Sequence, residues 1–309
     1  MSLTVTNVGL GVLTLAAVTA SVLACGRLRG LLQAGPRVEV DAMPAGRGAG
    51  GMRLINLLVA SIAVGSAGIL GLRWWSSGPL SKSLLVAHVD GLLLIVTLMA
   101  LIGLYIQTRP RLGGLSAFYL PVLAVMLAWA VCASAWTYRP FSLDTIHPVW
   151  KAVHLVGVYL GTLGSAVAAV AGGMYLYVER LLKAKRHPGG LLKLASLEML
   201  ERIIVQASTL GFGLLTLGLV SGVVILGDEG SLTAGWWYAP KVVLATAAWG
   251  VYAVVMNLRF ATMFRGRRAA WLAIGGLVLL LVVYGIVTSG AGHEAVSAAW
   301  PAGEGGRRA

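Results

Sequence analysis

The sequence has few charged residues, and this scarcity excludes an ordinary soluble fold. Only 11% of the 309 residues are Asp, Glu, Lys or Arg, whereas a soluble domain carries about 25%. Hydrophobic residues make up 58% of the chain. Because so few charges cannot cover a surface that faces water, we expect a protein embedded in a membrane, multi-pass and in the inner (plasma) membrane.

Cysteine is equally scarce. Cys25 and Cys132 are the two cysteines of the chain, and they fall near opposite ends of different apolar runs. Neither belongs to a C-x-x-C pair or to a zinc-binding spacing. We therefore expect no disulfide and no zinc site, and we interpret both thiols as small buried hydrophobes.

Long apolar runs are what the sequence has in abundance. A run of about 20 such residues is long enough to cross a bilayer as a helix. The first run lacks a basic n-region and is too long for the core of a signal peptide. We predict an all-α transmembrane bundle that forms a single integral membrane domain over residues 1–309. Its eight expected spans are about 4–25, 54–75, 84–107, 114–137, 150–177, 203–226, 239–263 and 269–288.

The net charge of +13 follows the predicted topology. Of the 24 Lys and Arg residues, 17 lie in the alternate loops 26–53, 108–113, 179–202 and 259–268. Positive charge collects on the cytoplasmic side of membrane proteins. These loops are therefore expected in the cytoplasm and both termini outside it. The basic charge indicates topology and not a nucleic-acid partner.

Two of these loops are long. Loop 26–53 is rich in Gly, Ala and Arg, and we interpret it as a flexible connection. In loop 179–202, Ser196 before Leu-Glu indicates the start of the helix that leads into the sixth span. The basic residues of this second loop suit either anionic lipid headgroups or a cytosolic protein partner.

Small residues recur four positions apart in the fifth and sixth spans. Gly157 and Gly161 form one such pair, and Gly218 and Gly222 form the other. Such pairs let membrane helices approach closely. They predict tight helix packing and nothing more specific.

Four of the five histidines fall toward the predicted outer side. His147 lies in the loop before the fifth span, His154 near the outer end of that span, and His88 near the outer end of the third. His293 follows the last span, and His187 lies in a cytoplasmic loop. Each alone suits an interfacial position. Ionisable groups within a membrane are functional candidates by default, so four on one side favour a site.

Haem is the ligand that these residues suit. A histidine supplies a nitrogen lone pair to haem iron, and two histidines on different helices can supply both axial ligands. Aromatic rings pack well against the flat, apolar porphyrin. The outer loop between the sixth and seventh spans contributes Trp236, Trp237 and Tyr238.

A series of segments between about residues 84 and 293 has a recognisable order. The segments are "HPVWKAVHLVGVYLG", "GGMYLYVERLLKAKR", "SLEMLERIIVQASTLGFGLLTLGLVSGVV", "GWWYAPKVVLATAAWGVYAVVMNLRF" and "RGRRAAWLAIGGLVLLLVVYGIV". In this order they resemble the CcsA/HemX group of cytochrome c assembly proteins. The resemblance covers about two-thirds of the chain and leaves the helices 4–25 and 54–75 less specific.

The resemblance implies a haem site on the outer face. In CcsA-type members an outer tryptophan-rich loop, the WWD domain, is implied to hold haem b between two outward histidines. Those histidines correspond to His154 and His293, and the loop to Trp236 and Trp237. Such a protein presents the haem vinyl groups to the cysteines of an apocytochrome c, together with a CcsB-like partner.

The sequence departs from the full pattern in its loop and in one helix. The loop has Ala239 and Val242 where the family carries acidic residues, and Asn257 stands where assembly enzymes have an intramembrane histidine. These changes favour the HemX-like branch, which is implied to assist haem biosynthesis or cytochrome assembly. No catalytic triad or paired carboxylates are visible, so we expect at most one part of a haem ligase system.

Three hypotheses therefore remain open. The first is a haem-handling protein that uses His154 and His293. The second is a HemX-like scaffold without haem, whose basic loop 179–202 docks a cytosolic enzyme of haem biosynthesis. The third is a b-type haem subunit of an electron-transfer complex, ligated by His88 and His154.

One acidic residue lies within a span. Asp90 follows His88 by two positions, and residues so spaced on a helix point to different faces. We expect Asp90 to meet a polar group of another segment instead, either Arg73 or Lys82.

Overall fold

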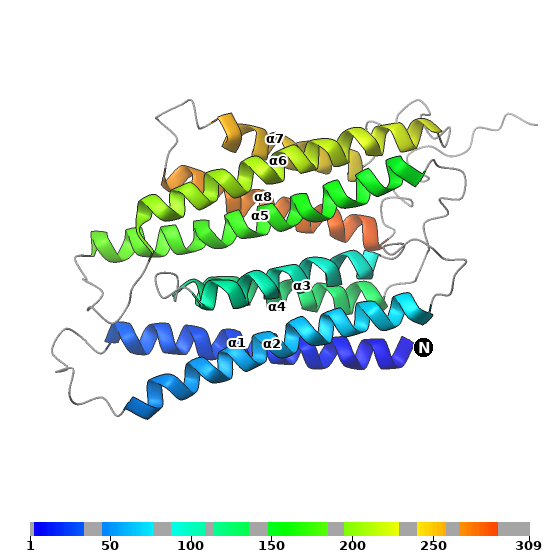
Figure 1. Cartoon of the computed structure of the whole chain (residues 1–309). Coiled ribbons are helices and arrows are strands. Elements are labelled where there is room, and N and C mark those ends of the chain that lie inside the picture. Colours follow the sequence, from blue (N-terminus) through cyan, green and yellow to red (C-terminus); the bar gives the residue numbers. More distant parts are fainter. Residues whose placement is uncertain are drawn as a thin grey trace, which may run out of the picture.

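The protein is all-helical over the residues that its computed structural model describes (Figure 1). Those residues are 3–33, 45–76, 88–108, 114–135, 148–184, 195–228, 240–257 and 266–289. Within them lie α1 (Leu3–Gln33), α2 (Ala45–Ser76), α3 (His88–Gln107), α4 (Ser116–Ala135), α5 (Pro148–Lys183), α6 (Leu197–Asp228), α7 (Pro240–Asn257) and α8 (Arg267–Ser289). Each corresponds to one predicted span, so the predicted fold class is confirmed.

The helices have the length and composition of membrane spans. Seven of the described helices are long and apolar enough to cross a bilayer. The exception is α7, in which the apolar stretch among described residues is Ala245–Val254. In lipid a backbone must satisfy its own hydrogen bonds, and apolar runs of this length therefore fold as helices. The chain is a multi-pass membrane protein.

Two of the predicted loops are shorter than expected because helices extend into them. We expected a connection over 26–53, but α1 continues to Gln33 and α2 already begins at Ala45. Similarly, α5 continues to Lys183. The prediction was wrong here because it ended each helix with its apolar run, whereas a helix satisfies its backbone hydrogen bonds in water as well.

The predicted helix start at Ser196 is confirmed. The Ser196 hydroxyl accepts a hydrogen bond from the backbone N–H of Met199 at 3.2 Å, and α6 begins at Leu197. This is the usual geometry of a serine N-cap. It fixes the position at which the polypeptide enters its sixth helix.

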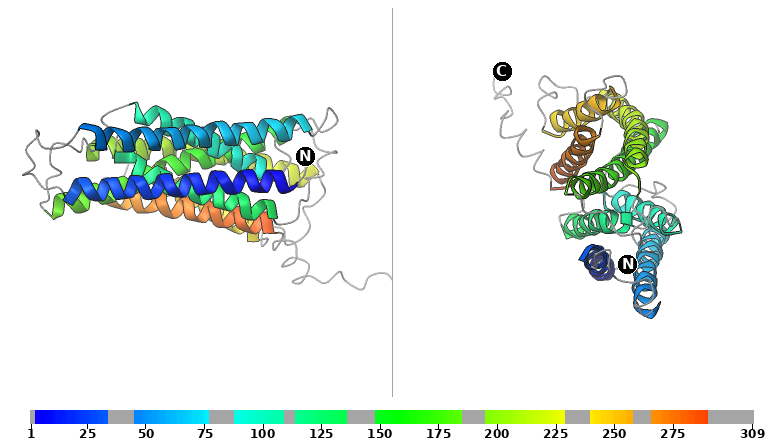
Figure 2. Two further views of the ribbon diagram at one scale, coloured as in Figure 1. Left: turned by 90° about the horizontal axis from the view of Figure 1, so that it is seen from below. Right: turned by 90° about the vertical axis from the view of Figure 1, so that its left-hand side faces the viewer.

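The eight helices form two groups of four. The first group is α1 to α4, in which α1 packs on α2 and α4, and α3 packs on α2 and α4. The second is α5 to α8, in which α5 packs on α6 and α8, and α7 packs on α6 and α8. The right-hand view of Figure 2 looks along the helices and shows the groups side by side. Helix α5 joins them by packing on α3 and α4.

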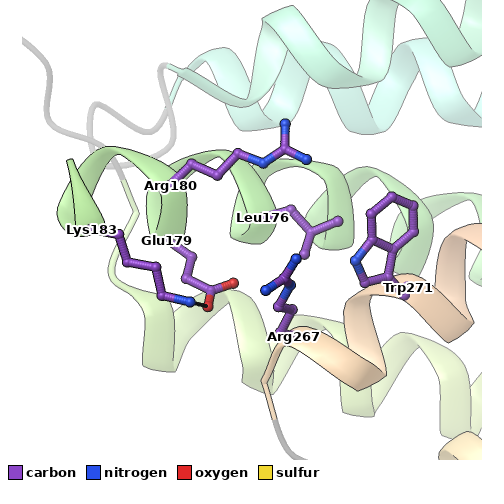
Figure 3. Close-up of a pocket in the computed structure, with 6 residues that line it drawn as sticks. All are labelled: Leu176, Glu179, Arg180, Lys183, Arg267 and Trp271. Atoms are coloured by element: carbon purple, nitrogen blue, oxygen red, sulfur yellow. Dashed lines mark hydrogen bonds and ion pairs between the residues drawn. The ribbon is translucent and has the colours of Figure 1, made fainter.

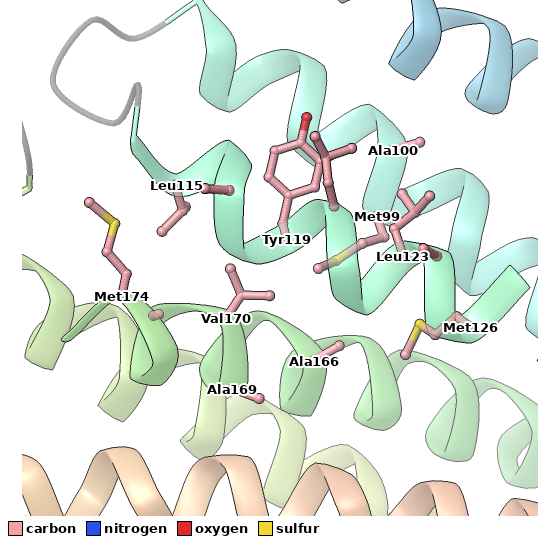
Figure 4. Packing of buried hydrophobic residues seen from close by; sticks show 14 of the residues in the cluster. Met99, Ala100, Leu115, Tyr119, Leu123, Met126, Ala166, Ala169, Val170 and Met174 are labelled. Atoms are coloured by element: carbon pink, nitrogen blue, oxygen red, sulfur yellow. The ribbon is translucent and has the colours of Figure 1, made fainter. Parts of the chain in front are cut away.

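A continuous apolar core fills the junction between the two groups. Met99, Tyr119 and Leu123 of the first group face Val170 and Met174 of α5 (Figure 4). All five are almost completely buried. Burial of this kind holds α5 against the first group.

Neighbouring helices alternate in direction, so the described bundle has two distinct ends (Figure 1). We call the end at which α5 begins and α6 ends the His154 end, and the opposite end the basic end. The Lys and Arg residues of the described helices at the basic end are Arg27, Arg29, Arg47, Arg53, Arg180, Lys183, Arg202, Arg267 and Arg268. Those at the His154 end are Arg73, Lys151 and Lys241. The orientation of these ends across the membrane stays a prediction.

The two cysteines are free, and one of them differs from our expectation. Cys25 is partly buried and its thiol lies 3.7 Å from the carbonyl oxygen of Ala117. Cys132, however, is exposed on α4, so its predicted burial was wrong. A position that faces lipid suits an apolar thiol as well as a protein core does, because both environments exclude water.

Candidate functional site

His154 lies at the contact between α5 and α6, near one end of the bundle. Its Nδ1 is 2.8 Å from the carbonyl oxygen of Gly218 on α6. The ring also lies close to Gly222, where a Cβ would be 3.1 Å from the imidazole Cε1. Gly218 thus binds this imidazole through its carbonyl oxygen, and Gly222 leaves the space in which the ring packs.

The hydrogen bond determines which ring nitrogen of His154 carries the proton. A carbonyl oxygen can only accept, so Nδ1 must donate its proton to Gly218. In a neutral imidazole the other nitrogen, Nε2, then has a free lone pair. Histidines that bind metals are commonly held in this way, with one N–H on a backbone carbonyl and the other nitrogen on the metal. Nε2 of His154 is therefore the ring nitrogen with a lone pair available to donate.

The glycines also explain why α5 and α6 can approach so closely. A Cβ at Gly157 would lie 2.8 Å from the backbone nitrogen of Gly218 and 2.8 Å from the carbonyl oxygen of Leu214. Further along, a Cβ at Gly164 would lie 3.1 Å from the Cα of Gly211. The tight packing predicted from the spaced glycines is confirmed for these two helices.

A second polar feature lies at the His154 end, between α2 and α3. Arg73 Nε donates to Asp90 Oδ1 at 2.5 Å, and both side chains are largely buried, with 20% and 14% exposure. The predicted partner Arg73 is thereby confirmed, while the alternative, Lys82, lies outside the described residues. The ion pair neutralises a carboxylate that would otherwise be costly at this depth.

Tyr159 of α5 packs against α3 at the residue that follows Asp90. Gly91 follows Asp90 on α3, and the ring of Tyr159 occupies the space that a side chain at Gly91 would fill. Tyr159 is 3% exposed and lies five residues after His154 on α5. The close approach of α3 to α5 thus links the Arg73–Asp90 pair to the helix that carries His154.

The remaining predicted site residues are placed less fully. His88 is the first residue of α3, at the His154 end, but its side chain is not among those described. His147, His293, Trp236 and Trp237 lie outside the described residues. Their roles stay predictions, as does the pairing of His88 with His154.

The described helix ends do set the position from which these segments depart. Pro148 begins α5, Asp228 ends α6, Pro240 begins α7 and Ser289 ends α8. All four residues belong to the His154 end (Figure 1). The chain segments that carry His147, the two tryptophans and His293 are therefore attached at the end of the bundle where His154 lies.

Sequence reasoning missed the backbone carbonyl of Gly218 as the partner of His154. Its signal was present in the spacing of Gly218 and Gly222, which removes two side chains, one turn apart, from α6. The sequence did not show which histidine would face that gap, because the pairing joins residues 64 positions apart.

Comparison with known proteins places this arrangement in a family. The model of the cytochrome c assembly protein family matches residues 85–292. The cytochrome c biogenesis protein CcsA of Prochlorococcus marinus (strain MIT 9303) is 27% identical over 259 residues, which cover 75% of this chain and 80% of the relative.

Two further relatives carry the same name. CcsA of Synechococcus sp. (strain CC9605) is 27% identical over 75% of this chain and 82% of its own. CcsA of Synechococcus sp. (strain RCC307) is 36% identical over a shorter stretch, 28% of this chain and 27% of its own. No solved structure matches. The family model spans two-thirds of the length of this chain, and the ordered segments had already indicated the resemblance. This chain therefore belongs to the cytochrome c assembly protein family.

Proposed function

We propose that this cytochrome c assembly protein handles haem b at the extracytoplasmic face of the inner (plasma) membrane, with His154 as an iron ligand. The observation that carries the proposal is the hydrogen bond from Nδ1 of His154 to the Gly218 carbonyl. It fixes the ring and leaves Nε2 with a free lone pair. Haem is the substrate of cytochrome c assembly, so the site would hold it for transfer and not for turnover within this chain.

The other residues of the proposed site act around His154. His293 supplies the second nitrogen ligand, and Trp236 and Trp237 cover a face of the porphyrin ring. What supports their inclusion is the position of Asp228, Pro240 and Ser289, from which their segments depart at the His154 end. An apocytochrome c would approach this end from outside, with a CcsB-like partner.

The proposal is tested by absorption spectroscopy of two matched histidine variants. Purified protein, expressed with added haem precursor, should show a Soret band. His154→Asn should lose most of that band, because the Asn amide nitrogen can keep the bond to Gly218 but offers no counterpart to Nε2. His187→Asn is the control, since His187 follows the last residue of α5 by four positions in the sequence, whereas His154 belongs to the beginning of that helix. The control should keep the full band.

The two variants separate a ligand from a merely structural histidine. If His154 only holds α5 to α6, His154→Asn should keep both its melting temperature and its Soret band. Addition of imidazole to His154→Gly provides a second check, because free imidazole can occupy the vacated ligand position. Recovery of the band supports ligation at this residue.

A second pair of variants identifies the other axial ligand. Loss of the band in His293→Ala, with retention in His88→Ala, supports the extracytoplasmic site proposed here. The opposite result favours a b-type haem between α3 and α5. A parent protein that stays colourless would contradict both, and would favour a scaffold that docks a cytosolic enzyme of haem biosynthesis.

The orientation is tested separately. Alkaline phosphatase folds into an active enzyme only outside the cytoplasm, so a fusion at the C-terminus should be active, whereas a fusion in the segment 185–194 should not. The reverse pattern would place the His154 end in the cytoplasm and contradict the extracytoplasmic assignment.

A further inference from the structure

A small pocket opens at the basic end, between the end of α5 and the beginning of α8 (Figure 3). It is formed by helices and lies at the opposite end of α5 from His154. Its lining residues are Leu176, Glu179, Arg180, Lys183, Arg267 and Trp271. Half of these side chains are cationic, which suggests an anionic ligand.

The charges within the pocket are not all balanced by one another. Lys183 pairs with Glu179 on the same helix at 2.5 Å, and Glu179 is the more buried partner at 17% exposure. Glu179 is the single carboxylate of the lining, and Lys183 already neutralises it. Among the described residues, no carboxylate forms an ion pair with Arg180 or Arg267. The pocket therefore carries an excess of two positive charges, supplied by guanidinium groups from two helices.

An apolar strip continues from the pocket along α8. Trp271 is 50% exposed and lies one turn after Arg267, and Val278 and Val282 follow on the outer surface with 54% and 47% exposure. At about 1.5 Å per residue, the strip from Trp271 to Val282 is ~16 Å long. This matches half of the ~30 Å hydrocarbon core of a bilayer. Tryptophan is also typical of the boundary between headgroups and acyl chains.

We propose that this pocket binds the phosphate of an anionic phospholipid, with Arg180 and Arg267 on the phosphate oxygens and an acyl chain along the strip on α8. Guanidinium groups bind phosphate oxygens in a planar, two-pronged geometry. Basic pockets between membrane helices are suited to such headgroups. A free phosphate ion would satisfy the arginines but would leave the apolar strip without a role. The bound lipid would join α8 to α5.

The experiment measures lipid binding through the thermal stability of the full chain. The protein is purified in a neutral detergent and melted in the presence of increasing phosphatidylglycerol. Parallel titrations use phosphatidylcholine, which has no net charge, and inorganic phosphate, which has no acyl chain. Phosphatidylglycerol should raise the melting temperature of the parent protein in a saturable manner, and neither of the other two additives should match it.

The matched variants remove the same charge inside and outside the pocket. Arg180→Gln with Arg267→Gln should raise the phosphatidylglycerol concentration at half-effect about 25-fold, from about fivefold for each basic residue near an anionic lipid. Arg53→Gln with Arg202→Gln removes two exposed arginines elsewhere at the basic end and should change it less than twofold. Arg180→Lys with Arg267→Lys keeps the charge and should retain most of the binding.

Three results would overturn the proposal. The first is an equal loss in the two glutamine double variants, which would show a diffuse charge effect. The second is stabilisation by inorganic phosphate as strong as that by the lipid, which would indicate a soluble anion. The third is an equal response to phosphatidylcholine. All four arginines are exposed. The melting temperature without lipid should therefore be similar in all variants, and its measurement verifies that each variant folds.

Discussion

Replacement of Gly157 by alanine should separate α5 from α6 at the site of His154. The added Cβ would lie 2.8 Å from the backbone nitrogen of Gly218 and 2.8 Å from the carbonyl oxygen of Leu214. Both neighbours are backbone atoms of a helix, so neither can rotate away as a side chain could. The two helices must therefore move apart to accommodate a single methyl group.

The size of the effect follows from the distances. Ordinary van der Waals contact begins near 3.4 Å, so the helices must separate by about 0.6 Å. Overpacking of this kind costs about 1–3 kcal/mol. The same movement lengthens the 2.8 Å bond from His154 to Gly218 beyond the usual 3.2 Å limit. Loss of an interhelical hydrogen bond in a membrane adds about 0.6–1.7 kcal/mol, for a total of about 2–5 kcal/mol.

The assay is thermal unfolding of the detergent-solubilised protein, with Gly213→Ala as the control. Gly213 lies on α6, and a Cβ there would meet nothing within 4 Å. Gly157→Ala should melt roughly 5–10 °C below the parent, while the control should melt at the same temperature or slightly above it. Equal melting temperatures for the two variants would refute the close contact described here. In haem-loaded protein, Gly157→Ala should also weaken the Soret band.

Three further predictions concern helix contacts elsewhere, each measured as a free energy of unfolding in mixed micelles. Arg73→Gln and Asp90→Asn should each destabilise the protein, and a double-mutant cycle should give a coupling of about 1–3 kcal/mol, since the charges lie 2.5 Å apart and are mostly buried. Ser66→Ala with Thr97→Val should reveal a coupling of about 0.5–1.5 kcal/mol, because the two hydroxyls bridge α2 and α3 at 2.8 Å. Gly266→Ala should cost at least about 1–2 kcal/mol, because Gly266 has a φ of 73° and an added Cβ would also press against the hydroxyl of Tyr175 on α5.

Each of these predictions has its own control. Singles whose effects simply add would show that Arg73 and Asp90 do not interact, and the same holds for Ser66 and Thr97. For Gly266 the comparison is Gly275→Ala on α8, where a Cβ would meet nothing within 4 Å. If both glycine variants have the same stability, backbone conformation is not what requires Gly266.

A large part of the fold could be predicted from the sequence because a bilayer leaves so few choices. Eight apolar runs gave eight helices, and the start of α6 at Leu197 was indicated by Ser196. Asp90 had two basic candidates near its end of the membrane, and Arg73 is the one that binds it. In each case a buried polar group or a helix end requires a partner, and few candidates lay within reach.

The ends of the helices were harder to predict. We expected the fifth span to end near residue 177, but α5 continues to Lys183, and α1 continues past its apolar run to Gln33. Hydropathy marks where a helix leaves lipid, not where it stops. Cys132 shows a similar limit, since an apolar residue in a membrane span can face either protein or lipid.

The sequence by itself determined that this chain crosses a membrane many times, that its basic residues gather in alternate loops, and that its ordered motifs resemble a cytochrome c assembly family. Those properties depend on composition and on order along the chain. Only the tertiary structure decided that His154 bonds to Gly218, that Gly157 faces the same glycine, and that Arg180 and Arg267 line one pocket. Helices that are apolar on every side carry no periodic signal for their rotation, so which faces meet depends on close packing between distant residues.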